Sequence, residues 1–167
     1  MKSNLLSCGK LDIPEALTLD HEKISAELLR ASKEPGAIGK AAKRVTELCL
    51  PHFAKEEKNV FHAFGVLHDL MAERVRPDMA AVMPLVAQFS AQHYALNDHH
   101  QSIKAALDEL LQEARKEENQ EISQLVYTLR NHERIEDELM YPTVLLIDGS
   151  FRQSLGIQQP ETKSRTY

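Results

Sequence analysis

Residues 52–61 read HFAKEEKNVF, and residues 132–141 read HERIEDELMY. Each stretch begins with a histidine, has a glutamate four positions later and an aromatic residue nine positions after the histidine. Residues four apart on an α-helix lie on the same face, so each stretch places an imidazole beside a carboxylate. Because the arrangement occurs twice, the sequence predicts two helices that direct the same functional groups into one site.

A lone histidine precedes each stretch at nearly the same distance. His21 lies 31 residues before His52, and His100 lies 32 residues before His132. An isoleucine follows each leading histidine by three positions and a leucine follows it by seven. These shared offsets indicate an internal pseudo-repeat of two helix pairs, too degenerate to be a solenoid repeat.

The chain between residues 12 and 146 has apolar residues at helical spacing, and no strand-like alternation stands out. The first helix is expected to start at the signal Asp12-Ile13-Pro14-Glu15 and to end before Pro35-Gly36. The other helices are expected at 37–65, 78–114 and 120–140, with 66–76 as an extension or a connecting helix and Pro142 as a kink or an end. The sequence therefore predicts an all-α fold, an up-down-up-down four-helix bundle.

Bulk composition limits the classes of protein. The 167 residues fit one domain, which we expect at 1–150, with a polar tail at 151–167. A net charge of −5 and a pI near 5.9 argue against binding to nucleic acid or an anionic membrane. No stretch approaches the roughly 20 apolar residues of a membrane span.

Two cysteines, Cys8 and Cys49, are too few for a disulfide framework and favour a reducing compartment. Leu5-Leu6-Ser7-Cys8 weakly resembles a lipoprotein cleavage site but lacks the preceding apolar run of about 7–15 residues that a signal peptide needs. We therefore expect a cytoplasmic protein with a mature N-terminus.

The repeated polar residues fall on the apolar faces of the predicted helices, where unpaired charges are unfavourable by several kcal/mol each. Metal ions would offset this penalty, and imidazole with carboxylate ligands suits iron, manganese or zinc. The candidate ligands are His21, His52, Glu56, His100, His132 and Glu136. The alternative is a metal-free core in which the histidines hydrogen-bond to the two glutamates.

The chain resembles the hemerythrin-like, or HHE cation-binding, family over about residues 15–145. The matching segments are Asp20-His21-x-x-Ile24, His52-x-x-x-Glu56-Glu57, His100-x-x-Ile103 and His132-x-x-x-Glu136-Asp137, followed by Met140-Tyr141-Pro142. The resemblance implies a four-helix bundle that holds two iron ions, commonly with an oxo or hydroxo bridge. It also implies that His21 and His52 serve one iron, His100 and His132 the other, and that Glu56 and Glu136 bridge them. A single iron ion or zinc remains an alternative.

One position departs from the oxygen-carrying members of that family, which have a fifth histidine four residues before the one on the third helix. Here that position is Leu96. Each iron would then keep an open position, which favours reaction with O2, NO or peroxide over simple reversible carriage. The sequence leaves open whether the protein is a carrier, a sensor, an enzyme or an iron storage or repair protein, and which protein partner it has.

Other polar side chains near the motifs are expected to have lesser roles. We expect a rim position for His99, a core or outer position for His93, exposure for His62 and His68, packing for Tyr94 and Tyr127, and solvent contact for Glu57 and Asp137.

Three other classes of helical protein compete with this interpretation. A ferritin-like oxidase needs Glu-x-x-His, which occurs nowhere in the chain. A histidine phosphotransfer module needs one exposed histidine, and His100 with Lys104 only hints at this. A structural bundle that binds zinc would use the same ligands as the iron site.

Overall fold

The computed structural model describes residues 13–74 and 76–154, without the side chains of residues 77, 78, 80, 94, 95 and 97. This part of the chain is helical and contains no strand, so the all-α prediction is confirmed. Its α-helices are α1 (Glu15–Ala31), α2 (Gly36–Asn59), α3 (Phe61–Phe64), α4 (Leu67–Met71), α5 (Met83–Lys116), α6 (Gln120–Ile135) and α7 (Tyr141–Ser154). A 3₁₀ helix, η1 (Pro77–Val82), precedes α5, and a π-helical turn, η2 (Glu136–Met140), joins α6 to α7.

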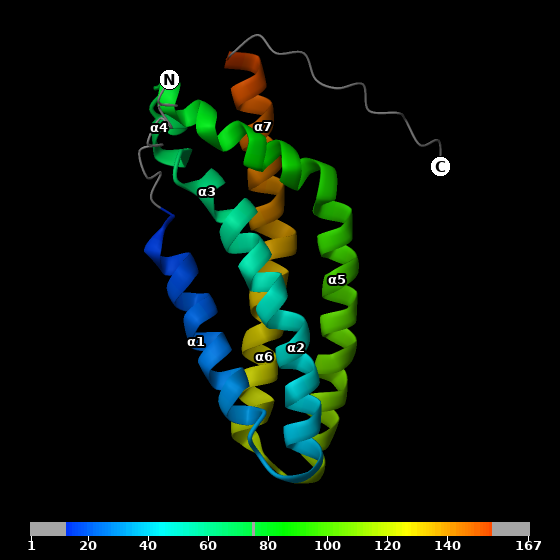
Figure 1. Cartoon of the computed structure of the whole chain (residues 1–167). Coiled ribbons are helices and arrows are strands. Elements are labelled where there is room, and N and C mark those ends of the chain that lie inside the picture. Colours follow the sequence, from blue (N-terminus) through cyan, green and yellow to red (C-terminus); the bar gives the residue numbers. More distant parts are fainter. Residues whose placement is uncertain (1–12, 75, 155–167) are drawn as a thin grey trace, which may run out of the picture.

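Four long helices lie side by side, and α7 continues the line of α6 (Figure 1). Helix α2 packs against both α1 and α5, and α6 packs against both α5 and α1. The long helices α1, α2, α5 and α6 alternate in direction along the chain (Figure 1), and the short α1–α2 and α5–α6 connections each reverse it.

The connection between α1 and α2 depends on two glycines. Gly36 has a φ of 77°, a backbone conformation that glycine adopts without strain. At Gly39, a Cβ atom would lie 1.7 Å from the carbonyl oxygen of Glu34, so no larger residue fits there. The close approach packs the connecting segment against the first turn of α2.

The helix boundaries differ from the predicted ones at several places; the third predicted helix, for example, was expected to begin at 78, but α5 begins at Met83. The second predicted helix was expected to reach Gly65, but α2 ends at Asn59 and the separate short helix α3 follows. The fourth was expected to reach Met140 and to stop or bend at Pro142, but the chain stays helical to Ser154. An end of the helix at Pro142 was therefore wrong. The π turn explains this continuation, because it loosens the backbone where the proline ring would otherwise meet the carbonyl of residue 138.

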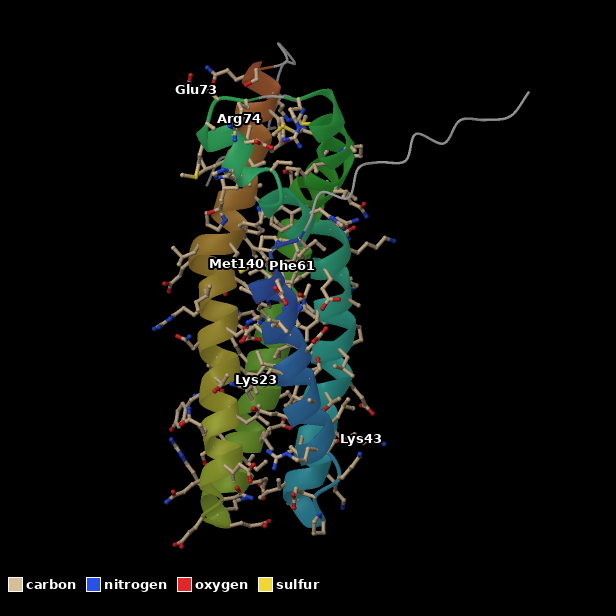
Figure 2. The ribbon with its side chains drawn as sticks, turned by 90° about the vertical axis from the view of Figure 1, so that its left-hand side faces the viewer. Lys23, Lys43, Phe61, Glu73, Arg74 and Met140 are labelled. Atoms are coloured by element: carbon tan, nitrogen blue, oxygen red, sulfur yellow. The ribbon has the colours of Figure 1, made fainter. Side chains whose placement is uncertain are left out.

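Two apolar clusters fill the space between the long helices. The first contains Leu28, Val45, Leu107, Leu110 and Leu129, and the second contains Phe61, Val86, Phe89, Val144 and Phe151. Along the chain, the predicted histidines and glutamates lie near the points where residues of one cluster give way to residues of the other. In Figure 2, Phe61 and Met140 mark the second cluster, and Lys43 lies toward the end that holds the first. The polar residues thus form one layer at the junction of two apolar regions.

The C-terminal part of the chain is more apolar than expected up to Ser154. Helix α7 runs four residues past the predicted domain boundary at 150, and Phe151 is only 1 % exposed. The rest of the predicted tail and the segment around Cys8 lie outside the described residues, as does the predicted capping residue Asp12.

Candidate metal centre

The six predicted ligands converge in the polar layer, and none is more than 8 % exposed. They form two groups of four that share two glutamates, and within each group the potential ligand atoms lie within 4.8 Å of one another. We call these groups the α1/α6 pocket, made of His21, His132, Glu56 and Glu136, and the α2/α5 pocket, made of His52, His100, Glu56 and Glu136. The structure brings all six residues together, and each pocket could hold a metal ion.

Glu56 lies between the two pockets. Its Oε2 atom is 3.5 Å from His21 Nε2 and 3.6 Å from His52 Nε2. Its other oxygen, Oε1, accepts a hydrogen bond from the hydroxyl of Tyr141 at 2.5 Å. One carboxylate oxygen therefore faces imidazoles of both pockets, while the tyrosine fixes the orientation of the group.

Glu136 is placed in the same way from the opposite side. Its Oε1 atom lies 2.7 Å from His132 Nε2 and 3.6 Å from His21 Nε2, and its Oε2 atom lies 3.4 Å from His100 Nε2. Burial by itself raises the pKa of Glu136, but the three adjacent imidazoles outweigh burial and hold its pKa well below the ordinary value. This carboxylate is the fixed negative charge of the centre.

The imidazoles pair differently from the expectation based on family resemblance. His21 Nε2 lies 3.2 Å from His132 Nε2, and His52 Nε2 lies 2.7 Å from His100 Nε2. The expected pairs, His21 with His52 and His100 with His132, do not match this grouping and were wrong. The reason is that the rings of α1 and α6 turn toward each other at this level, as do those of α2 and α5.

The outer nitrogen, Nδ1, of three imidazoles faces a carboxylate. The pairs are His21 with Glu57 at 3.1 Å, His100 with Asp137 at 2.7 Å and His132 with Asp20 at 2.7 Å. Glu57 and Asp137 keep part of their predicted solvent contact, with 43 % and 28 % of their side chains exposed, but each also contacts an imidazole of the centre. Each follows a buried glutamate and is rotated by about 100° around its helix, which lets its carboxylate reach an imidazole on another helix while one edge stays exposed.

His99 supports the fourth imidazole. Its Nδ1 lies 3.4 Å from His52 Nδ1, and the two ring centroids are 5.3 Å apart. The side chain is half-buried, so its predicted position at the rim is confirmed, but it also contacts a candidate ligand.

These outer contacts determine what the inner nitrogens can do. A carboxylate only accepts hydrogen bonds, so each imidazole nitrogen that faces one carries the proton. In a neutral ring the inner Nε2 then carries a lone pair. The α1/α6 pocket therefore collects two nitrogen lone pairs and the oxygens of Glu56 and Glu136, with no donor among them. A cation or added protons must satisfy such a cluster of acceptors.

Protonation preferences show how the pockets respond without a metal ion. Burial lowers the pKa of His100 and His132, but contact with the charged Glu136 outweighs it, so both pKa values are raised. Burial and then the charge of Glu136 raise the pKa of Glu56 well above its ordinary value. Burial and the nearby His100 lower the pKa of His52 to about 3. Protons would thus occupy the positions that a metal ion would otherwise take.

Tyr141 was among the matching positions of the sequence motifs, but the sequence analysis gave it no role in the site. It follows the π turn, in which residues five apart rather than four lie on the same face. Tyr141 therefore lies on the same face as Glu136. Its ring stacks on that of His100 with the ring centroids 5.6 Å apart, and its hydroxyl lies 3.4 Å from His100 Nε2. The sequence signal that could have identified Tyr141 is that it occupies the position in the repeat equivalent to Phe61. The ring centroid of Phe61 lies 4.8 Å from that of His21.

Glu133 is a second buried residue that the sequence analysis missed. It is 2 % exposed, and neither of its carboxylate oxygens has a hydrogen-bond partner. Burial raises its pKa to about 7. It belongs to neither pocket, although it directly follows His132 in the chain.

The remaining candidates lie outside both pockets. His93 Nδ1 lies 2.9 Å from the backbone oxygen of Ser90 on its own helix, which agrees with a role other than ligand. His68 is exposed as expected, whereas His62 is half-buried.

Leu96, at the position of the missing fifth histidine, packs against the second apolar cluster. Tyr127 is exposed and accepts a hydrogen bond from Arg115, and the side chain of Tyr94 is outside the described part.

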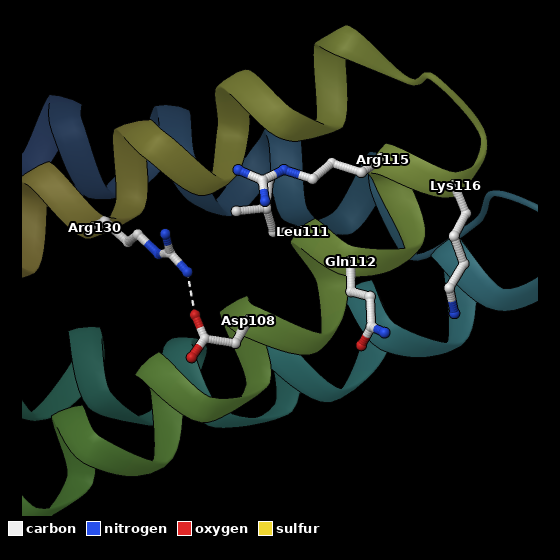
Figure 3. A pocket seen from close by; sticks show the side chains of 6 residues that line it. All are labelled: Asp108, Leu111, Gln112, Arg115, Lys116 and Arg130. Carbon is white, nitrogen blue, oxygen red and sulfur yellow. Dashed lines mark hydrogen bonds and ion pairs between the residues drawn. The ribbon is translucent and has the colours of Figure 1, made fainter.

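A surface groove between α5 and α6 contains none of the six predicted ligands (Figure 3). Exposed charged side chains line it, and Arg130 forms an ion pair with Asp108 across it. No buried polar group points to a ligand there, so the groove is not a candidate site. Across residues 13–74 and 76–154, no helix has both the length and the apolar character needed to cross a membrane.

Comparisons with family models, with curated proteins and with solved structures give no match for this chain.

Proposed function

We propose that this protein is a hemerythrin-like four-helix bundle with up-down-up-down topology that binds two metal ions, with iron as the favoured metal. We further propose that the metal pair binds, senses or reacts with O2, NO or peroxide. The resemblance of the sequence motifs to that family supports the proposal, as does the meeting of those motifs in one buried layer.

The observation that carries the proposal is the convergence of acceptors in the α1/α6 pocket. Asp20 and Glu57 hold the outer nitrogens of the two imidazoles as donors, so the inner nitrogens face each other as acceptors at 3.2 Å. A metal-free core in which glutamates accept from the histidines would need donors on the inner side, and these appear only when the rings gain protons.

The ligand chemistry favours iron over softer metals. Two imidazoles and two shared carboxylates per pocket suit iron, manganese or zinc, and no thiolate takes part. Such a set leaves room for a small molecule at each metal ion. Iron would supply one-electron redox chemistry and Lewis acidity at that position.

The surrounding residues give the centre a defined environment. Phe53 stacks on the ring of His21 at 4.1 Å, and Phe61 covers the same ring from another direction. These rings exclude water from one side of the α1/α6 pocket. In the α2/α5 pocket the Tyr141 hydroxyl lies 3.4 Å from the inner nitrogen of His100 and donates its proton to the shared Glu56.

The competing classes fit these observations less well. His100 is 0 % exposed, so a phosphotransfer partner could not reach it. A structural zinc site uses four ligands around one ion, whereas here two carboxylates are shared between two pockets. Iron storage or repair uses the same centre and differs only in whether iron leaves it.

Metal analysis combined with an absorption spectrum tests the proposal. We expect about two iron ions per chain and absorption in the near-ultraviolet and visible that changes when O2 or NO is added. Glu56→Ala and Glu136→Ala should each lower the metal content well below two, while the exposed control Glu138→Ala should not. A colourless protein with zinc would overturn the assignment of iron, and full occupancy in both variants would overturn the shared carboxylates.

A further inference from the structure

The internal repeat relates the two pockets, but one equivalent position differs chemically. Asp20 directly precedes His21, and His99 directly precedes His100. Asp20 places a carboxylate oxygen 2.7 Å from His132 Nδ1. His99 instead places an imidazole nitrogen 3.4 Å from the Nδ1 atom of His52. The same place in the repeat thus holds a negative charge beside one pocket and a neutral ring beside the other.

A second difference also reduces the negative charge beside the α2/α5 pocket. Asp137 contacts His100 through Oδ1, but its Oδ2 also accepts a hydrogen bond from Lys104 Nζ at 3.1 Å. Glu57 supports His21 at the equivalent position, and the residue equivalent to Lys104 is the uncharged Ser25. The positive charge of the lysine partly neutralises the carboxylate that Asp137 presents to His100.

A carboxylate that accepts the outer N–H of a histidine raises the basicity of the inner nitrogen and fixes the ring for metal binding. The α1/α6 pocket has two such carboxylates, neither shared with a lysine. The α2/α5 pocket has one, shared with Lys104, and a neutral imidazole in place of the other.

We propose that the two pockets bind metal with unequal affinity, the α1/α6 pocket first and the α2/α5 pocket second. Asp20 and His99 are the positioning residues that set the difference. This inference rests on the proposed two-metal function. Its consequence is that the more weakly held ion lies in the pocket where the Tyr141 hydroxyl approaches His100.

Titration of the metal-free full chain with Co²⁺ tests the order of binding. The visible absorption of bound Co²⁺ gives the isotherm, and the paramagnetically shifted N–H proton signals of the ligating imidazoles report which rings bind. We expect two phases whose dissociation constants differ by about 10-fold or more, since outer partners of metal-binding histidines change affinity by about 10–100-fold. His132→Ala should remove the tighter phase, and His52→Ala should remove the weaker one.

Substitution of the two positioning residues should change the phases separately. His99→Asp should tighten the second phase by about 10-fold, and Asp20→Asn should weaken the first by about 10–100-fold, with Asp20→Glu restoring most of the loss. His68→Asp and Glu22→Gln make the same kinds of change at exposed positions outside the pockets and should alter neither phase.

The outcomes separate this inference from the proposed function. Two Co²⁺ ions bound with equal affinity would overturn the inference and leave the two-metal function standing. Failure to bind Co²⁺ at all would overturn both. If His99→Asp does not fold, Asp20→Asn decides alone, and an effect of this variant on the weaker phase would refute the assignment.

Discussion

The hydroxyl of Tyr141 lies 2.5 Å from Glu56 Oε1, although 85 residues separate them in the chain. The contact joins the start of α7 to the last part of α2 and orients a carboxylate that faces both pockets. Burial, then the charges of Glu56 and Glu136, raise the pKa of Tyr141 above its ordinary value. The phenol therefore stays protonated and acts as a donor at neutral pH.

Tyr141→Phe should retain the fold and both metal ions but lose this donor. In EDTA the free energy of unfolding should fall by about 1–2 kcal/mol, because a buried acceptor loses its partner. The spectral change on adding NO or peroxide should also differ from that of the wild type. Urea denaturation and stopped-flow absorption measure these effects. Tyr127→Phe removes an exposed hydroxyl and is the control; an equal response of both variants would contradict the role of Tyr141.

Glu133 should make the stability of the metal-free protein depend on pH. Burial raises its pKa from 4.5 to about 7, so the folded state binds a proton more tightly than the unfolded state. The titration of Glu133 therefore leaves the free energy of unfolding unchanged below about pH 4.5 and lowers it as the pH rises toward 7.

Glu133→Gln removes the titration while keeping the shape of the side chain. Its free energy of unfolding relative to wild type should rise between pH 5 and pH 8 by about 1–3 kcal/mol, because over this range the folded wild type has to ionise a buried carboxyl group. Denaturation in EDTA across this pH range measures it, with Glu138→Gln as an exposed control. A difference that does not vary with pH would show that Glu133 does not titrate in this range.

Metal binding should release protons. The pKa values of Glu56, His100 and His132 are raised in the metal-free protein, and a ligand must be deprotonated to bind a metal ion. Affinity should therefore fall as the pH is lowered through these pKa values.

Calorimetric titration with Zn²⁺ at pH 7, repeated in buffers of different ionisation enthalpy, should show release of about one proton or more for two ions bound. Heats that do not depend on the buffer would mean that the pockets carry no exchangeable proton.

Removal of the metal ions should lower thermal stability. At free metal a thousandfold above the dissociation constant, binding stabilises the folded state by about 4 kcal/mol, so the Tm should fall clearly on addition of EDTA. The double variant Glu56→Ala/Glu136→Ala should show no such shift. Calorimetric melting curves with and without EDTA decide this, and an EDTA effect of equal size in the double variant would place the bound metal elsewhere.

Some of these features were accessible from the sequence because they depend on local periodicity. The spacing of His52 and Glu56, and its repetition at His132 and Glu136, requires only the helical repeat to place each pair on one face. The apolar residues at the same offsets predicted that these faces point inward, and all four are buried.

The outer partners were not predictable in this way. Glu57 and Asp137 lie about 100° away from the buried face of their own helices, so the local pattern predicts solvent contact. Only the rotation and neighbours of each helix bring them within reach of His21 and His100. Tyr141 was hidden by the π turn, since normal helical spacing would place it away from Glu136.

The sequence by itself determined that the described chain is helical and which six polar side chains meet inside it, because the helical period and the apolar pattern are local properties. The tertiary structure alone decided how the imidazoles pair, which groups support their outer nitrogens and where the tyrosine hydroxyl lies. These relations join residues that are far apart in the chain, and they depend on how each helix is rotated against its neighbours, which spacing along the chain does not encode.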